Sequence, residues 1–166
     1  MQTFLGTLLL LGVEVTYLLL FTTILNACTC RLKSIQDIVC GSDWVSHLTI
    51  LGKYDTIAID TNVEGPQIAG NLMYITLHKE IFKVADNETE IEPIIFTSKN
   101  EILCGMPDLI VGKEYLLAGY YTGDINRIRL CDQMSPEKNP RFLFPPEWHQ
   151  IPDDVKDKLR KDFYKC

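Results

Sequence analysis

Six cysteines constrain what this chain can fold into more than any other feature, and all of them come after residue 27. An even number of cysteines behind a secretory signal predicts three disulfides in an oxidising compartment. Six cysteines allow 15 pairings, and spacing alone does not choose among these. A zinc-finger site is disfavoured because it needs two close pairs of ligands, and here only one pair is close. The cysteines are Cys28, Cys30, Cys40, Cys104, Cys131 and Cys166.

Residues 1–27 differ from the rest of the chain. Residues 4–25 are almost wholly apolar or small, and no Lys or Arg occurs before Arg31. We favour a cleaved secretory signal, because Ala27 provides the small residue that such a signal needs before the cut. The domains we expect are therefore a signal peptide over 1–27 and one secreted domain over 28–166.

Two other interpretations of the leading segment stay open. A retained membrane anchor is one, because the apolar stretch approaches the roughly 20 residues that span a bilayer. Glu14 disfavours the anchor, since a carboxylate in hydrocarbon is costly. A bacterial lipoprotein signal is the other, because Leu25-Asn26-Ala27-Cys28 is similar to its cleavage box. The lack of an N-terminal Lys or Arg weakens that interpretation.

The charge of the mature part excludes some partners. Removal of residues 1–27 takes away one charged residue, Glu14, and leaves a net charge of −5. No basic patch with interleaved aromatic residues is present, so nucleic acid is excluded as a partner. Basic and acidic residues alternate between Asp153 and Asp162, which indicates a solvated helix face.

Five segments with strand patterns and the turns between them predict a mainly β fold. Gly123-Asp124 predicts a tight hairpin between the last two strands. Five short strands closed by a helix suggest a small antiparallel barrel, best matched by the five-stranded Greek-key barrel of the OB type. The predicted strands are 44–51 with an extension over 54–60, 73–82, 91–97, 114–121 and 125–130.

Two short helices flank these strands. One helical turn is expected around 34–39. Asp153 is expected to cap a second helix, which carries Val155, Leu159 and Phe163 on one apolar face. Trp148 and Phe144, beside a proline-rich stretch, are interpreted as lid residues that pack on the barrel.

An enzyme is disfavoured. The three histidines are scattered along the chain, at His47, His78 and His149. The sequence shows no recognisable Ser/His/Asp or Cys/His catalytic arrangement. Cysteines in disulfides cannot act as nucleophiles. Asn87-Glu88-Thr89 is an N-glycosylation sequon at a predicted turn, which suits a secreted protein.

The cysteine pattern resembles one known family. Cys28-Thr29-Cys30, followed after nine residues by Cys40, resembles the start of the mature tissue inhibitors of metalloproteinases. The similarity extends over essentially all of 28–166. The other residues on which the resemblance rests are Gln36, Ser42-Asp43, Phe96-Thr97, Glu101-Ile102-Leu103-Cys104-Gly105, Tyr115-Leu116-Leu117-Ala118-Gly119, Cys131, Trp148, Ile151 and Cys166.

The resemblance implies a fold and a contact surface. The fold would be the netrin-like OB module, with disulfides Cys28–Cys104, Cys30–Cys131 and Cys40–Cys166. Two of these would place residues 28–31 beside 101–104, and the two stretches would form a ridge that enters a protease cleft. The contact residues implied are Cys28, Thr29, Cys30, Arg31, Glu101, Ile102, Leu103 and Cys104.

The function implied is inhibition of secreted zinc metalloproteinases of the matrix metalloproteinase class. The α-amine and carbonyl oxygen of Cys28 would chelate the protease zinc, so the inhibitor needs no cofactor of its own. Thr29 would enter the primed-side pocket next to that zinc. We expect an extracellular monomer with no membrane span in the mature form, and the extracellular matrix as a possible further partner. The alternatives are a netrin-like binding module without inhibitory activity, and a lipid-anchored or membrane-tethered form.

The sequence departs from the family at several points. The family's vertebrate members carry a second domain, whereas this chain is expected to hold the inhibitory domain alone. Arg31 and Leu32 replace a small apolar residue and a proline that are common in the family after Cys-x-Cys. A long cationic side chain at this position is expected to change which proteases fit.

Overall fold

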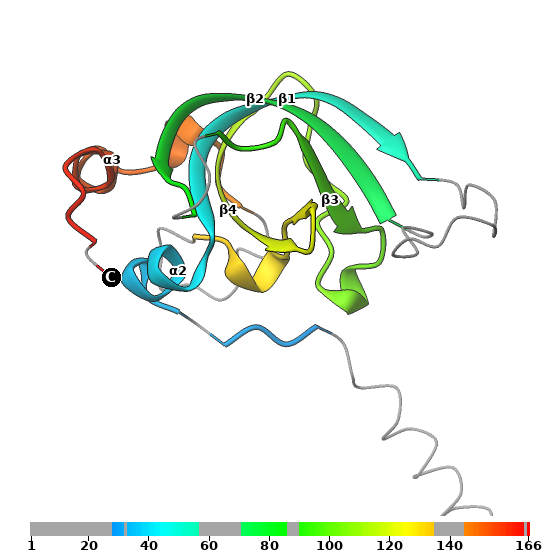
Figure 1. Cartoon of the computed structure of the whole chain (residues 1–166), viewed down its shortest axis with the longest axis horizontal. Helices are drawn as coiled ribbons and strands as arrows, with labels where there is room; N and C mark the ends of the chain where they lie inside the picture. The colour runs from blue at the N-terminus through cyan, green and yellow to red at the C-terminus, as the bar shows by residue number, and fades with distance from the viewer. Residues whose placement is uncertain (1–27, 32, 57–70, 86–89, 135–144, 165) are drawn as a thin grey trace, which may run out of the picture.

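Five strands form a closed barrel in the computed structural model of the chain, among the residues that it describes (Figure 1). Those residues are 28–31, 33–56, 71–85, 90–134, 145–164 and 166. The predictions for residues 1–27, Leu32, 57–70, Asn87 and 135–144 lie outside them. The strands are β1 (Trp44–Asp55), β2 (Asn71–Lys83), β3 (Ile94–Ser98), β4 (Glu114–Thr122) and β5 (Ile125–Arg127).

The helical elements are short. They are α2 (Ile35–Gly41), α3 (Asp153–Arg160) and the 3-10 turns η2 (Glu101–Leu103), η3 (Leu130–Asp132) and η4 (Trp148–Gln150). None of the helices in the described ranges is long and apolar enough to cross a membrane. The mainly β fold, the OB-type barrel and the flanking helices predicted from the sequence are therefore confirmed.

The prediction of a wholly antiparallel barrel needs one correction. The strand order around the barrel is β1-β2-β3-β5-β4, and β3 pairs with β5 in parallel through Phe96 and Arg127. The other four pairings are antiparallel. Strand directions cannot alternate all the way around a ring of five, so one parallel pairing is unavoidable. The Gly123-Asp124 hairpin joins β4 to β5 as predicted, and Gly123 adopts a φ of 57° there.

Several predicted boundaries differ from the structure by a few residues. Strand β3 begins at Ile94 because Pro93, just before it, has no N–H to donate to a neighbouring strand. Strand β5 ends at Arg127, and the chain then enters η3. Asp153 is the first residue of α3 rather than its cap, because Pro152 occupies the cap position.

The predicted apolar face of the last helix is one residue too long. Val155 and Leu159 are buried, but Phe163 is 63% exposed. Helix α3 ends at Arg160, and Asp162 then adopts a left-handed φ of 50°. The N–H of Phe163 donates to the carbonyl of Lys158, a bond that turns the chain away from the helix axis.

Two apolar clusters hold the barrel together. One fills the interior around Trp44, whose indole N–H donates a 2.7 Å hydrogen bond to Asn126. The second joins the outer face of β1 and β4 to α2 and α3, which lie on the same side of the barrel (Figure 1). The interior cluster includes Leu48, Ile50, Tyr74, Ile95, Leu117 and Ile128, and the outer one Ile38, Val39, Val45, Leu116, Ala118, Val155 and Leu159.

The closing segment is held to the barrel by an aromatic and ionic cluster. Trp148 of η4 stacks on the buried His47 ring at 4.0 Å, which agrees with its interpretation as a lid residue. The Nε2 atom of the same His47 ring forms a 2.8 Å hydrogen bond with the Glu114 carboxylate. Arg160 of α3 donates bonds of 2.9 and 3.1 Å to Glu80 on β2. Strands β1, β2 and β4 thus all contribute to holding the closing segment of η4 and α3.

The close packing at Trp44 gives the first testable prediction. A Cβ at Gly119 would lie 2.2 Å from the Trp44 ring, which is fully buried and has no space to move. We expect Gly119→Ala to lower the free energy of unfolding by about 1–3 kcal/mol in urea denaturation. Gly41→Ala is the matched control, because nothing lies within 4 Å of its Cβ position. Equal stability of the two variants would show that the ring does not occupy this place.

A second prediction concerns the Glu80–Arg160 pair. The hydrogen bonds from Arg160 hold the pKa of Glu80 below its usual value. Such a carboxylate stabilises the fold above its unfolded pKa of about 4.3, and this stabilisation is lost as pH falls through the folded pKa. Glu80→Gln should therefore cost up to about 1 kcal/mol at pH 7, and the deficit should vanish in acid.

Urea denaturation of Glu80→Gln from pH 7 down to pH 3 checks this sign. The exposed Glu90, which forms no ion pair with any described residue, provides the control Glu90→Gln. A deficit that grows in acid, or an equal deficit in the control, would contradict the assignment.

Candidate functional site

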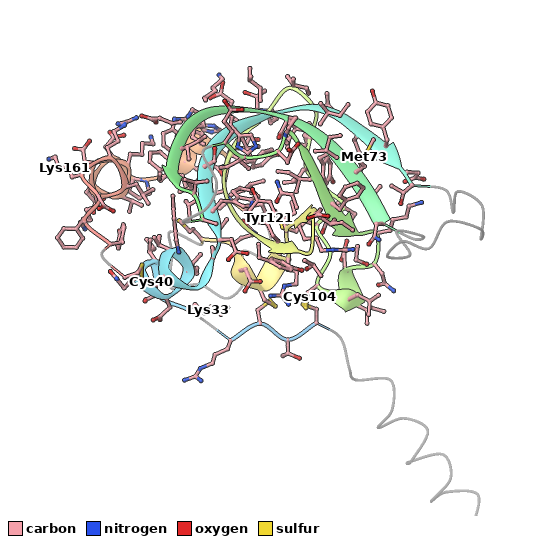
Figure 2. All side chains as sticks on the ribbon, viewed as in Figure 1. Lys33, Cys40, Met73, Cys104, Tyr121 and Lys161 are labelled. Atoms are coloured by element: carbon pink, nitrogen blue, oxygen red, sulfur yellow. A yellow bond between two sulfur atoms is a disulfide. The ribbon has the colours of Figure 1, made fainter. Side chains whose placement is uncertain are left out.

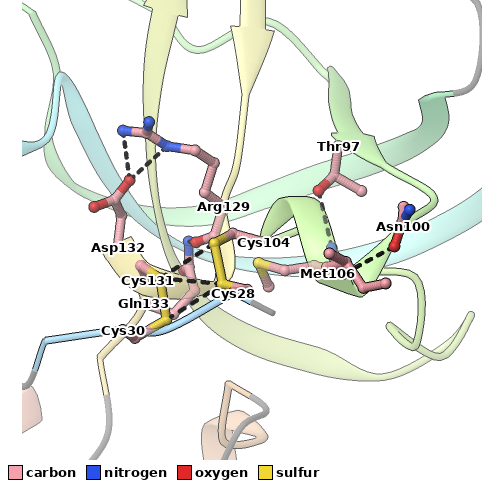
Figure 3. The surroundings of a disulfide bond; sticks show 11 residues. Cys28, Cys30, Thr97, Asn100, Cys104, Met106, Arg129, Cys131, Asp132 and Gln133 are labelled. Atoms are coloured by element: carbon pink, nitrogen blue, oxygen red, sulfur yellow. Dashed lines mark hydrogen bonds and ion pairs between the residues drawn. A yellow bond between two sulfur atoms is a disulfide. The ribbon is translucent and has the colours of Figure 1, made fainter. Parts of the chain in front are cut away.

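Two disulfides fasten the segment 28–31 to the barrel. Cys28 is bonded to Cys104 and Cys30 to Cys131, with Cα–Cα distances of 5.1 and 4.9 Å (Figure 3). Figure 1 shows this segment running along one end of the barrel beneath η2 and η3. The bonds join residues 76 and 101 positions apart in sequence, so they fix the segment against parts of the chain far from it.

A third disulfide lies away from this site. Cys40 near the end of α2 is bonded to Cys166. Figure 1 shows the C-terminus beside α2, and Figure 2 labels Cys40 there. The three bonds have the pairing that the family resemblance implies.

The residues 101–104 form an exposed turn beside the tethered segment. The side chain of Asn100 accepts a 2.9 Å bond from the N–H of Ile102, which caps η2. The N–H of Cys104 donates to the carbonyl of Glu101, and Cys104 itself adopts a left-handed φ of 58°. The turn leaves Ile102 58% and Leu103 67% exposed. We call residues 28–31 and 101–104 together the ridge.

The barrel fixes the far side of this turn. Thr97 on β3 accepts a 3.0 Å bond from the N–H of Met106 and donates one of 3.0 Å to the carbonyl of Ile128. The N–H of Leu130 donates to the carbonyl of Cys104 at 2.9 Å. A Cβ on Gly105 would lie 2.0 Å from the carbonyl oxygen of Ser98, so only glycine allows this approach. The turn is therefore held by backbone contacts on both sides.

A small ionic group joins the N-terminal segment to η3. Asp132 accepts a 2.7 Å bond from Lys33. It also accepts a 2.9 Å bond from Arg129 (Figure 3). The Arg129 guanidinium also lies over the Tyr120 ring, 4.3 Å from its centroid. Burial raises the pKa of Tyr120, so its phenol stays neutral beside this cation. These contacts hold the chain just after the ridge.

The structure brings the residues predicted for the site into one place. Cys28 is bonded to Cys104, and Cys30 to Cys131, whose sulfur lies 3.5 Å from that of Cys104. Thr29 and Arg31 lie in the same segment as Cys28 and Cys30. Sequence reasoning gave no supporting role to Thr97, Asn100 or the Lys33–Asp132 pair. An Asn before a helical turn is a known cap signal and could have been found. The pair could not, because its members are 99 residues apart.

The cysteines of this site form a close group of sulfur atoms. The four sulfur atoms of Cys28, Cys30, Cys104 and Cys131 lie within 4.8 Å of one another, a grouping that thiolates could use to hold a metal. All four are in disulfides, and metal binding needs deprotonated thiolates. Cleavage before Cys28 would create an α-amine next to the Cys28 carbonyl, two groups that can ligate a metal ion together.

Comparisons with known proteins agree with this architecture. A family model described as tissue inhibitor of metalloproteinase matches residues 26–139. A Caenorhabditis elegans protein named "Putative metalloproteinase inhibitor tag-225" is 30% identical over 162 residues, which cover 94% of this chain and 98% of that protein.

Fold and site together define a barrel of the OB type, fastened by disulfides, that presents a tethered N-terminal segment beside an exposed turn. With the match over 26–139 and the similarity over nearly the whole chain, the protein belongs to the tissue inhibitor of metalloproteinase family.

The cap at Asn100 gives a prediction on the shape of the ridge. Asn100→Ala removes the side-chain acceptor of the Ile102 N–H, which should cost about 1 kcal/mol at most and loosen the turn locally. Hydrogen exchange should become faster at Ile102 and stay unchanged at Leu117 in the barrel interior. Ser34→Ala, which removes the cap of α2, is the matched control and should affect only α2. Unchanged exchange at Ile102 would mean that the cap does not hold the turn.

Proposed function

We propose that the mature protein begins at Cys28 and inhibits secreted zinc metalloproteinases by binding their catalytic zinc. The observation that carries this proposal is the Cys28–Cys104 disulfide, which joins Cys28 to an exposed turn bearing Ile102 and Leu103. Membership of an inhibitor family and similarity to a protein named as an inhibitor support the same function.

The mechanism follows from the backbone groups of Cys28. An α-amine has a pKa of about 7.7–8.0, so it loses its proton at small cost near neutral pH. The free amine and the carbonyl oxygen of Cys28 can then form a five-membered chelate with one zinc ion. A catalytic zinc keeps a position open for water, and this water is the nucleophile in hydrolysis. The chelate would take that position and leave the protease without its nucleophile.

The remaining ridge residues would determine how well a protease fits. The Thr29 side chain would enter the primed-side pocket next to the zinc. Ile102 and Leu103 are exposed aliphatic side chains that can bury against the rim of a cleft. Because two disulfides already hold segment 28–31, binding orders little additional chain, which lowers its entropic cost.

The proposal includes a location and a processing step. Residues 1–27 are removed as a secretory signal, and the protein acts as an extracellular monomer with zinc supplied by its target. The rival function is a netrin-like binding module that uses the same barrel without inhibiting a protease. The two differ in whether a free α-amine on Cys28 is needed.

One added residue tests this difference. A chain with a single Ala ahead of Cys28 keeps every barrel contact but moves the α-amine away from the Cys28 carbonyl. We expect inhibition of a matrix metalloproteinase catalytic domain to fall by at least about 100-fold, since the chelate is lost. A chain with one Ala after Cys166 is the matched control and should inhibit as the unmodified protein does.

N-terminal sequencing of the secreted protein completes the test. A mature chain that starts at any residue other than Cys28, or undiminished inhibition by the Ala-extended chain, would contradict zinc chelation. Equal thermal unfolding of both extended chains would show that the loss is not caused by misfolding.

A further inference from the structure

The two disulfides of the ridge are in contact with each other. The Cys131 sulfur lies 3.4 Å from the Cys28 sulfur and 3.5 Å from the Cys104 sulfur (Figure 3). The Cys28 and Cys30 sulfurs are 3.8 Å apart. The Cys40–Cys166 bond is not part of this group of four. A thiolate released from one ridge disulfide would therefore lie against the other.

The four cysteines of this group differ in how exposed they are to solvent. Cys30 is exposed, whereas Cys28, Cys104 and Cys131 are only partly accessible. A thiol arriving from solvent would thus reach the Cys30 sulfur first. Attack at that sulfur breaks the Cys30–Cys131 bond and releases Cys131 as the thiolate, on the side that faces the second disulfide.

We propose that this sulfur group is a thiol–disulfide exchange site, and that a small thiol of the glutathione type uses it to untether residues 28–31. In the first step the thiolate bonds to Cys30 and expels the Cys131 thiolate. In the second step the Cys131 thiolate bonds to Cys104 and expels the Cys28 thiolate, which takes up the proton of the incoming thiol. Two disulfides exist before and after, so neither an oxidant nor a reductant is consumed.

The geometry sets what the second step requires. The Cys131 sulfur is almost equally distant from both atoms of the Cys28–Cys104 bond, so it lies beside that bond and not in line with it. Exchange proceeds by attack of a thiolate on a disulfide sulfur, in line with the bond that breaks. The proposed second step therefore requires the Cys131 side chain to rotate once its bond to Cys30 is broken. The Leu130 N–H to Cys104 carbonyl bond already keeps these two segments together.

The product differs from the starting protein at the ridge alone. Cys104 and Cys131, 27 residues apart, become bonded within the barrel, while Cys28 is a free thiol and Cys30 carries the small thiol. The N-terminal segment then has no covalent link to the turn 101–104. The Cys104–Cys131 bond closes a loop of 27 residues, whereas the native bonds close loops of 76 and 101. A shorter loop constrains the unfolded chain less and therefore stabilises the fold less. We thus expect the native pairing to return when the small thiol is removed. A loss of inhibition in this state rests on the proposed function, whereas the exchange does not.

Peptide mapping tests the exchange directly. The mature protein is incubated with graded reduced glutathione, quenched with iodoacetamide, digested without reduction and analysed by mass spectrometry. We expect a Cys104–Cys131 linked peptide, alkylated Cys28 and glutathionylated Cys30, all rising together. The Cys40–Cys166 bond is the internal control and should enter no crossed pair. Alkylated Cys131 with an intact Cys28–Cys104 bond, joint reduction of both disulfides, or no reaction would each overturn the proposal.

A variant and an activity assay separate this inference from the proposed function. The double variant Cys28→Ser/Cys104→Ser has no second disulfide for the Cys131 thiolate to attack. Alkylation should therefore appear at Cys131, whereas in the unmodified protein it appears at Cys28. Inhibition by the unmodified protein should fall in proportion to Cys28 alkylation. A rearranged map with full inhibition would contradict the zinc-binding role of the ridge and leave the exchange site supported.

Discussion

The Cys28–Cys104 disulfide is the constraint on which the rest of the site depends. It joins the predicted first residue of the mature chain to a turn that the barrel holds through Thr97, Gly105 and Leu130. Without it, Cys30–Cys131 would be the one disulfide left on residues 28–31, beside noncovalent contacts such as the nearby Lys33–Asp132 pair. Surface ion pairs contribute little, so covalent attachment carries the positioning.

The barrel serves as a rigid support for this attachment. Closure into a ring leaves β3 and β5 side by side in parallel, and the turn 101–104 leaves from β3 while η3 follows β5. Cys104 and Cys131, the two barrel cysteines bonded to the segment 28–31, are therefore brought together by the one parallel pairing in the described sheet. The closing segment, held by Trp148 and Arg160, packs on a different part of the surface, away from the ridge (Figure 1).

Much of the fold could be predicted from the sequence because its signals are local. Alternating apolar residues marked the strands, and Gly123-Asp124 marked the hairpin. The disulfide pairing came from the family resemblance, since six cysteines alone leave many pairings open. The end of α3 before Phe163 was not predicted, because the left-handed Asp162 gives no clear signal in composition. The parallel pairing is a property of the whole ring, and no single segment encodes it.

The candidate site was predicted less completely, for a similar reason. Its eight ridge residues follow from the cysteine motif and the resemblance. Its supports join distant positions, such as Thr97 with Ile128 behind the turn and Lys33 with Asp132 beside the ridge. Such contacts depend on the folded arrangement and leave no pattern along the chain.

In the proposed mechanism, the backbone of Cys28 binds the zinc of a target protease. A crystal structure of the mature protein bound to a matrix metalloproteinase catalytic domain would decide this. We expect the α-amine and carbonyl oxygen of Cys28 both to ligate the zinc, in place of its water, with Thr29 in the adjacent pocket. A zinc that keeps its water while the protein binds elsewhere on the protease would contradict it.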